Sequence, residues 1–458
     1  MTGSGTAGAY HAGVLRAVHE AGMKIDLIAG CSMGVVGALF SAVDGTAWLW
    51  DASGPWRSAD GKRLYRWRAT VRVATRILAA VCFLLVVPLV ILAAGAVVYP
   101  TSFLLRLLGI EVGTSITSVY GQLLNTIFNP VLLPTFLPRV IVVVLVVLLG
   151  TLAVGVVTSS RRTRSRRTRG TLWWQILGAP LDMSRVVEKF TNGLRQLIGG
   201  GTPLVRLSLE DLGRSYSDLL TENLEQPGFK ELIVTVHDLD AKRDLVFALL
   251  ADSSRRDFFM PRTSSRKGQR SLETFDLSGV AREHVVDVLA GALSVPVITE
   301  PHLISFASDS QWRGEAHRLR GRPEAIVRLL EEVANAGVEQ VIVVSASADL
   351  SGPHALTATR RDARGLVGEH LAAAEATAVR DAISAKGHHF QALFEIRPGH
   401  NPLGPLDFRG CYDERSDRHQ SLSELVNRGY EDAYRRFVDP VVGASGERIE
   451  PSQSDSDF

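Results

Sequence analysis

The 458-residue chain predicts an α/β fold with a largely parallel sheet, interrupted by a two-helix transmembrane insertion. Strands that alternate with helices predict the α/β class, and two long stretches without charge predict the insertion. We expect residues 1–50 to form the first part of one domain and 51–171 the insertion. Residues 172–445 then complete the domain, and the polar residues 446–458 form a disordered tail.

The first element is a glycine-rich segment that opens a helix, Gly3-Ser4-Gly5-Thr6-Ala7-Gly8. Taken alone, G-x-G-x-x-G is the fingerprint of dinucleotide binding. That function needs a complete strand before the glycines and an acidic residue at the end of the next strand. No strand precedes the segment, and Asp26 comes before the next strand, so the sequence disfavours a dinucleotide site.

The second element is a strand at 27–29, followed by Gly30-Cys31-Ser32-Met33-Gly34 and another helix. G-x-S-x-G between a strand and a helix is typical of a nucleophile elbow, in which a sharp turn exposes the serine hydroxyl. Gly30 and Gly34 flank Ser32 because this turn leaves little room for side chains. Ser32 is therefore the candidate nucleophile.

Two membrane spans are expected next, at residues 77–99 and 140–158, about 23 and 19 residues long. At 1.5 Å per residue both reach across a bilayer core, and both exceed ordinary buried strands. Arginines and lysines crowd residues 57–76 and 161–169, whereas 100–139 carries few charges. Positive charge stays on the cytoplasmic side, so we expect a multi-pass inner-membrane protein whose globular domain is cytoplasmic. The connection 100–139 lies in the interface or re-enters the membrane.

The remaining elements follow from periodicity and turn signals. Residues 232–236 and 245–250 predict a strand pair, and 340–345 and 390–396 predict two further strands. Helices are expected at 281–291, 325–336 and 422–437.

Composition excludes several classes of function. The net charge of +2 makes no case for nucleic-acid binding. Cys31, Cys82 and Cys411 are an odd number without a CxxC pair, which argues against a disulfide framework and a structural zinc site. We expect no metal and no cofactor.

The two N-terminal motifs together resemble the patatin-like phospholipase family, through the pattern GxGxxGxxxxGVL, a strand and GxSxG. Residues 232–250 and 290–296 are also similar, so the resemblance covers about 1–45 and 200–345. It implies a patatin-like three-layer fold and a Ser–Asp dyad with Ser32 as nucleophile. It also implies an oxyanion hole formed by the glycine-rich segment and the elbow. Its backbone donors would be Gly3, Gly5, Thr6, Gly8 and Met33.

Three features depart from the family pattern. Ala7 and Ser4 stand where the family has Arg or Lys and Gly. The family's first strand is missing before Gly3, so we expect either that the true start lies upstream of Met1 or that the segment is poorly held. The family's Asp-Gly-Gly or Asp-Gly-Ala is absent after Pro296.

Two carboxylates are candidates for the missing acid. Spacing from Pro296 is compatible with Asp309, and spacing back from Pro323 favours Glu315. A Ser-His-acid triad is the alternative, and no spacing distinguishes its possible bases. These are His302, His317, His354, His388, His389 and His400.

The sequence thus predicts a membrane-bound serine acyl hydrolase that cleaves phospholipid or lysophospholipid esters at the cytoplasmic face. Ser32 would attack the ester carbonyl, and Glu315 or Asp309 would take its proton. The alternative is a catalytically impaired membrane scaffold or lipid-binding protein. Headgroup, acyl position and oligomeric state are not determined by the sequence.

Overall fold

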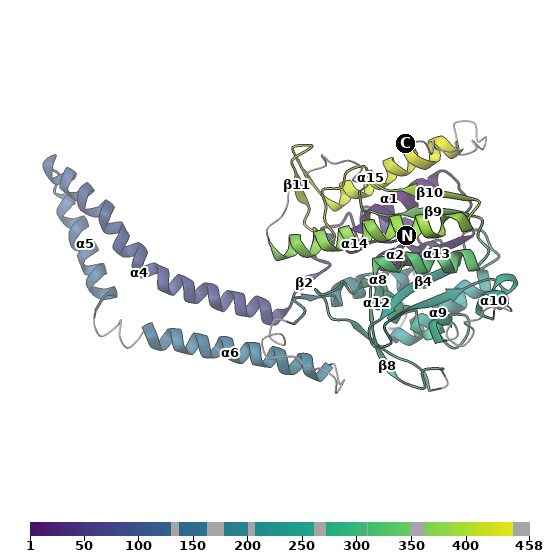
Figure 1. Ribbon diagram of the computed structural model, residues 1–458. Coiled ribbons are helices and arrows are strands. Elements are labelled where there is room, and N and C mark those ends of the chain that lie inside the picture. The colour runs from purple at the N-terminus through teal and green to yellow at the C-terminus, as the bar shows by residue number, and fades with distance from the viewer. Residues whose placement is uncertain are drawn as a thin grey trace. The chain divides into compact units, whose positions relative to one another are not determined.

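The computed structural model describes residues 1–129, 137–162, 178–199, 207–260, 272–308, 310–348 and 362–442 (Figure 1). The chain forms two compact units. Unit 1 comprises Met1–Arg66 and Leu181–Phe458, and unit 2 comprises Trp67–Pro180. The predicted tail 446–458 lies outside the described residues.

Unit 1 is built on a six-stranded sheet in the order β6-β5-β4-β8-β7, with β1 paired to β4. The strands are β1 (Leu27–Cys31), β4 (Glu231–Asp238), β5 (Arg243–Leu249), β6 (Thr274–Asp276), β7 (His302–Ser305) and β8 (Ala316–Arg320). β1 runs parallel to β4, and β6 parallel to β5. The pairs β4–β5, β4–β8 and β7–β8 are antiparallel. The α/β class is therefore confirmed. The sheet is mixed rather than largely parallel, because two hairpins contribute four of its strands.

Helices cover both faces of this sheet, which gives unit 1 three layers. Alternate residues of β4 face opposite sides: Leu232 and Val234 join one hydrophobic core, and Ile233 joins another. The first core includes α1 (Ala7–Glu20), α2 (Gly34–Ala42), α8 (Ser184–Ile198), α12 (Val285–Leu293) and α15 (Leu422–Ala433). The second includes α13 (Ile326–Asn335) and α14 (Ala363–Lys386).

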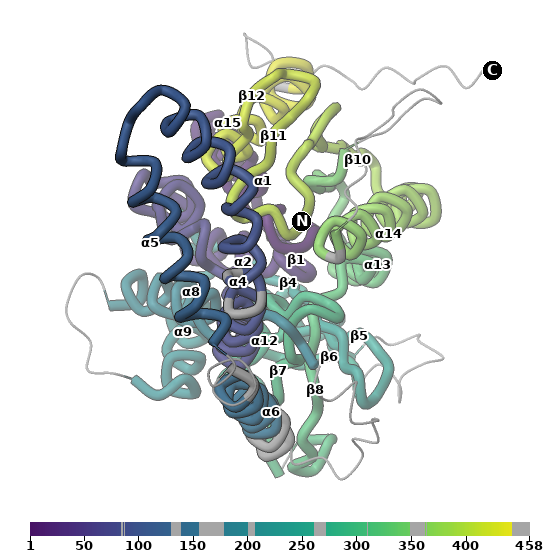
Figure 2. The backbone as a smooth tube through the Cα atoms, turned by 90° about the vertical axis from the view of Figure 1, so that its left-hand side faces the viewer, coloured from purple at the N-terminus to yellow at the C-terminus, as the bar shows by residue number. Residues whose placement is uncertain are grey.

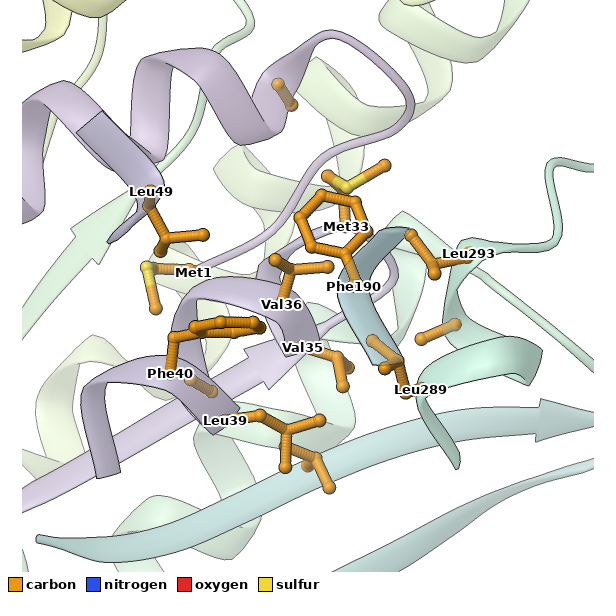
Figure 3. Packing of buried hydrophobic residues seen from close by; sticks show 14 of the residues in the cluster. Met1, Met33, Val35, Val36, Leu39, Phe40, Leu49, Phe190, Leu289 and Leu293 are labelled. Carbon is orange, nitrogen blue, oxygen red and sulfur yellow. The ribbon is translucent and has the colours of Figure 1, made fainter. Parts of the chain in front are cut away.

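The first core surrounds the helix that follows Ser32. Figure 3 shows side chains of α2, among them Val35 and Val36, in one cluster with Phe190 of α8 and with Leu289 and Leu293 of α12. Val35, Val36 and Ala38 are at most 1% exposed. Because dense packing holds α2 on both sides, the start of this helix has little freedom to move.

Several shorter elements complete unit 1. They are α3 (Ala47–Trp50), α9 (Leu209–Asn223), α10 (Asp252–Phe259), β2 (Arg66–Trp67), β3 (Leu181–Asp182), β9 (Gln340–Val344), β10 (Ala392–Ile396), β11 (Cys411–Asp413) and β12 (Arg418–Gln420). β9 and β10 form a separate parallel pair. In the tube view α13 and α14 lie side by side, near β10 (Figure 2).

Most predicted elements of unit 1 are present with shifted ends. The strand pair at 232–236 and 245–250 is confirmed as β4 and β5, and the strands at 340–345 and 390–396 as β9 and β10. The helices expected at 281–291 and 325–336 each begin with a 3-10 turn, Arg282–His284 and Pro323–Ala325. The closing helix α15 continues as a π-helix, Tyr434–Val442. Helix α14 was not expected.

The described part of unit 2 contains three helices, α4 (Ala69–Leu107), α5 (Val112–Ile127) and α6 (Leu137–Arg162). α5 turns back along α4: Tyr120 Oη donates to the Ile91 carbonyl at 2.8 Å, and Ser102 Oγ donates to the Gly113 carbonyl at 2.7 Å. The connection 100–139 therefore contains a helix, α5, that packs on α4 and reaches Ile91. Figure 1 shows α5 beside the C-terminal half of α4.

The two expected spans have different outcomes. Among the described residues, α4 alone is long and apolar enough to cross a membrane, with a mean hydropathy of 3.1 in its best window. The second expected span, 140–158, falls in α6, but its described apolar part, Arg139–Val154, is shorter than a span requires. The structure thus supports one candidate span.

Candidate active site

Ser32 lies where two strands meet end to end. β1 pairs with the first part of β4, up to Cys31 opposite Thr235, and β8 pairs with its end, where Arg320 lies opposite His237. β1 is parallel to β4 and β8 is antiparallel, so their carboxyl ends converge on the same edge of β4. Ser32, after β1, and Gly321, after β8, are therefore neighbours. A Cβ on Gly321 would lie 2.9 Å from Ser32 Oγ.

The backbone of Ser32 has the conformation expected of a nucleophile elbow. Its φ is +50°, in the left-handed region that residues with a side chain rarely adopt. Such a conformation costs about 1–3 kcal/mol and persists where the surrounding structure enforces it. Gly30 makes room for the sharp turn: a Cβ on Gly30 would lie 2.8 Å from the Val35 amide nitrogen at the start of α2.

The glycine-rich segment, Gly3 to Gly8, is buried and firmly held. The Thr2 amide donates to the Val344 carbonyl of β9 at 3.0 Å, and the Cys31 amide donates to the Met1 carbonyl at 3.1 Å. Thr2 Oγ1 donates to the Pro323 carbonyl at 2.9 Å. The segment thus lies between β9 and the elbow, and the expectation of a poorly held segment is wrong.

Two of the five expected oxyanion donors are already occupied. The Thr6 amide donates to the Pro405 carbonyl at 3.0 Å, and the Met33 amide donates to the Gly3 carbonyl at 2.9 Å. Gly3, Gly5 and Gly8 lie in the same buried segment, and within the described residues their amides have no backbone acceptor outside the helix. The oxyanion hole expected from the sequence is therefore incomplete in this arrangement.

Protein atoms cover the glycine-rich segment. A Cβ on Gly5 would overlap the Pro405 carbonyl and lie 3.2 Å from the Phe408 ring, and a Cβ on Gly8 would overlap the Trp56 ring. We call Trp56, Pro405 and Phe408 the cover. Trp56 is 2% exposed, and its Nε1 has no hydrogen-bond partner. Glycine is needed here for packing against the cover. Ser32, in the adjoining elbow, is only 3% exposed.

Glu315, the preferred acid, is far from Ser32. It immediately precedes β8, whereas Gly321 follows that strand, and six residues of extended chain span roughly 20 Å. The Glu315 side chain is 66% exposed and its Oε2 lies 3.2 Å from His317 Nε2. The Ser32–Glu315 dyad is therefore a wrong prediction. Asp309 lies outside the described residues.

The residue that precedes Gly321 is basic. An Asp-Gly dipeptide at this place would put a carboxylate directly before the glycine that faces Ser32, and here Arg320 takes that position. Burial lowers the pKa of Arg320, and the neighbouring Arg318 adds to this effect. No acid therefore precedes the glycine that faces Ser32.

The alternative catalytic histidines have other partners. His302 Nε2 lies 2.7 Å from Asp287 Oδ1, His317 Nδ1 lies 2.5 Å from Asp238 Oδ2, and His400 Nε2 lies 3.0 Å from Asp413 Oδ1. The rings of His388 and His389, in the 3-10 turn after α14, lie 4.1 Å apart and are tilted by 37°. His354 lies outside the described residues. Within the described part of the chain, no carboxylate or imidazole forms a hydrogen bond with Ser32 Oγ.

One buried carboxylate beside the glycine-rich segment was missed. Glu375 of α14 is 3% exposed and accepts a hydrogen bond from Ser345 Oγ at 2.7 Å. Burial raises the pKa of Glu375 to about 7. Hydrogen bonds from Ser345 and from the Ser4 amide act in the opposite direction and lower the pKa. The sequence around it, Ala-Ala-Glu-Ala-Thr, gives no sign of this role, because only the fold brings α14 to the N-terminal segment.

Among the described residues, no group of three histidine, cysteine or acidic side chains could hold a metal ion. The chain was also compared with known proteins. It matches no protein-family model, and no curated protein sequence matches it.

Proposed function

We propose that the chain is a membrane-tethered serine acyl hydrolase of the patatin-like phospholipase type, with Ser32 as its nucleophile. The observation that carries the proposal is the strained backbone of Ser32, with φ +50° between β1 and α2. Strain of this kind is costly and clusters at active sites. The adjoining buried glycine-rich segment supports the same function, since it can supply amides to a developing oxyanion.

The reaction would proceed in two acyl-transfer steps. Ser32 Oγ attacks the ester carbonyl of a lipid, its proton passes to a base, and the alcohol leaves with a proton. Water then hydrolyses the acyl-serine to release the fatty acid. The arrangement described here is the closed form in this proposal, because the cover lies over the segment and no base contacts Oγ. Substrate binding has to displace the cover first.

A lipid substrate is supported by the composition of unit 2. α4 exposes large apolar side chains along its charge-free stretch, among them Phe83, Leu89 and Val97, each at least 65% exposed. Apolar surface of this extent is stable only in a bilayer or against a partner. Basic residues before α4 would lie at the cytoplasmic face of an inner membrane. Phospholipid or lysophospholipid would then be the substrate available to Ser32.

The test is covalent labelling of the full-length, detergent-solubilised protein with a fluorophosphonate probe. The wild type should become labelled at Ser32, and Ser32→Ala should not. The same pair should differ in release of fatty acid from a short-chain ester and from lysophospholipid. Equal hydrolysis by both proteins would refute Ser32 as the nucleophile.

A second candidate function is a membrane-bound lipid-binding or scaffold protein without catalysis. Arg320 favours it, because a base stands where the acid of an Asp-Gly pair would precede Gly321. In this case Ser32 stays unlabelled in detergent and in phospholipid vesicles, while the protein still binds to the vesicles. The labelling experiment therefore separates the two functions.

A further inference from the structure

The Gly3–Ser4 peptide stands between Ser32 and the buried Glu375. Its carbonyl accepts the Met33 amide at 2.9 Å, on the side of the elbow. Its amide, on Ser4, interacts with the Glu375 carboxylate and favours the charged form of that group. The carbonyl and the amide of a trans peptide point in opposite directions. Glu375 and the elbow therefore act on the two ends of one planar unit.

Glu375 is firmly placed against this peptide. A Cβ on Gly3 would lie 3.3 Å and 3.6 Å from its two carboxylate oxygens, and Ser345 Oγ fixes Oε1 at 2.7 Å. Ser345 itself pairs with Thr2, next to Gly3. Within the described residues, no lysine, arginine or histidine is among the groups that act on the charge of Glu375. The buried carboxylate thus depends on hydroxyl and amide donors for its stabilisation.

In this orientation of the Gly3–Ser4 peptide, the Gly3 carbonyl occupies an expected oxyanion donor. In a nucleophile elbow, the amide of the residue after the serine is an oxyanion donor, and here that amide belongs to Met33. It is occupied as long as the Gly3 carbonyl points toward the elbow. Turning the peptide over would free the Met33 amide and direct the Ser4 amide to the same place. Such a turn changes ψ of Gly3 and φ of Ser4, and Gly3 eases it because a residue without a Cβ has a wider range of allowed backbone conformations.

We propose that Glu375 is a positioning residue that holds the Gly3–Ser4 peptide with its carbonyl on the Met33 amide, so that the oxyanion hole forms only when this hold is released. This inference rests on the proposed function. An ionised carboxylate can only accept, so it favours the Ser4 amide facing it. A protonated carboxyl can donate to the Gly3 carbonyl and favours the turned peptide. Glu324 and the Cys31 thiol are the titratable groups whose charges act on this site.

The experiment compares fluorophosphonate labelling of the full-length wild type and Glu375→Gln from pH 5 to pH 9. At pH 8 the variant should be labelled at least about fivefold faster, because a neutral amide holds the Ser4 amide less strongly than a carboxylate does. The ratio of the two rates should fall toward one below pH 6, where the wild-type carboxyl is protonated. Taking the ratio cancels pH effects that both proteins share. A ratio of one or less at every pH would overturn the proposal.

Two further variants serve as an independent test and as a control. Ser345→Ala removes a hydrogen bond to the ionised carboxylate, so the midpoint of the wild-type pH response should move upward; an unmoved midpoint also speaks against the proposal. It serves as the main variant if Glu375→Gln does not fold. Asp413→Asn, which neutralises another buried carboxylate beside His400, is the matched control and should leave the ratio unchanged.

Hydrogen exchange of backbone amides tests the position of the Gly3–Ser4 peptide without requiring catalytic activity. The peptide that contains Met33 should exchange faster in Glu375→Gln than in the wild type at pH 8, because the Gly3 carbonyl no longer protects its amide. Faster exchange without any labelling of Ser32 would support the role of Glu375 in positioning the Gly3–Ser4 peptide and refute the proposed hydrolase activity. Unchanged exchange together with unchanged labelling would refute the positioning role of Glu375.

Discussion

Single residues at the site are held in conformations that are costly for the fold. Ser32 keeps a left-handed backbone, and Glu375 keeps a carboxyl group in the interior without a cationic partner among the described residues. Each lowers the free energy of unfolding, and each lies beside the glycine-rich segment. Stability measurements on these two positions therefore report on the site without requiring activity.

Ser32→Gly should stabilise the protein while abolishing fluorophosphonate labelling. Glycine adopts φ +50° without the steric cost of a Cβ, so the free energy of unfolding should rise by up to about 1 kcal/mol. Thermal unfolding in detergent measures the change. Ser32→Ala is the matched control, because it keeps the Cβ and should gain nothing. A loss of stability in Ser32→Gly comparable to that of a core substitution would contradict the assigned strain.

The stability of the wild type should fall as the pH rises from about 4.5 to about 7. The pKa of Glu375 is raised by burial to about 7, so in this window the folded protein binds a proton that the unfolded chain releases. The stabilisation is present below pH 4.5 and lost as the pH passes 7, with a total on the order of 1–3 kcal/mol. Chemical unfolding at pH 5 and pH 8 measures it. Glu375→Gln should lack this part of the pH dependence; an identical slope in both proteins would argue against a shifted Glu375.

At the scale of elements, the segment before α4 and the loop before β11 supply the cover on the glycine-rich segment, which in the proposed function has to move before substrate reaches Ser32. Trp56 comes from the first and Phe408 from the second, and both pack on the glycine-rich segment. The side chains of Trp56, Arg57 and Ser58 each contain a buried polar atom without a partner. Burying such atoms unpaired costs free energy, so the cover is less stable than an ordinary core contact.

Trp56→Leu should therefore increase the rate of Ser32 labelling, by about fivefold or more, because it removes the ring that packs against Gly8. Trp48→Leu is the control. The Trp48 ring packs on Gly193 of α8 and on Phe40 near the end of α2, so this substitution should leave the rate unchanged. Both variants lose a large apolar side chain, which separates uncovering from general destabilisation. Equal labelling rates in the two variants would mean that Trp56 does not limit access.

At the scale of the whole molecule, the chain consists of a three-layer α/β unit and a helical unit of different composition. The clearest test of the second unit concerns α4. Leu89→Arg places a charge in the middle of its apolar stretch, where an arginine costs about 2.5–3.5 kcal/mol on insertion scales. Resistance of the full-length protein to alkaline extraction from membranes should fall. Leu209→Arg, on a half-exposed position of α9, should have no effect. Unchanged extraction of Leu89→Arg would argue against α4 as a span.

The sequence predicted the elements that depend on local pattern. Three elements were recognisable: the elbow at Ser32, the β4–β5 hairpin and the apolar helix α4. Their signals are turn residues, alternating apolar and polar positions, and a long stretch without charge, and each signal depends only on neighbouring residues. Element ends shifted where 3-10 turns open α12 and α13. The mixed character of the sheet was missed, because strand direction is set by how hairpins pair across the fold.

The sequence by itself determined that a serine would stand at a sharp strand-to-helix turn beside a glycine-rich segment, since these features need only adjacent residues. Only the tertiary structure decided what surrounds that serine. It brings Gly321 and Arg320 to Ser32, moves Glu315 to the far end of β8, and sets Glu375 and Trp56 against the glycines. Such contacts join segments far apart in the chain, and the physical reason is that packing of whole elements, rather than local preference, fixes their distance.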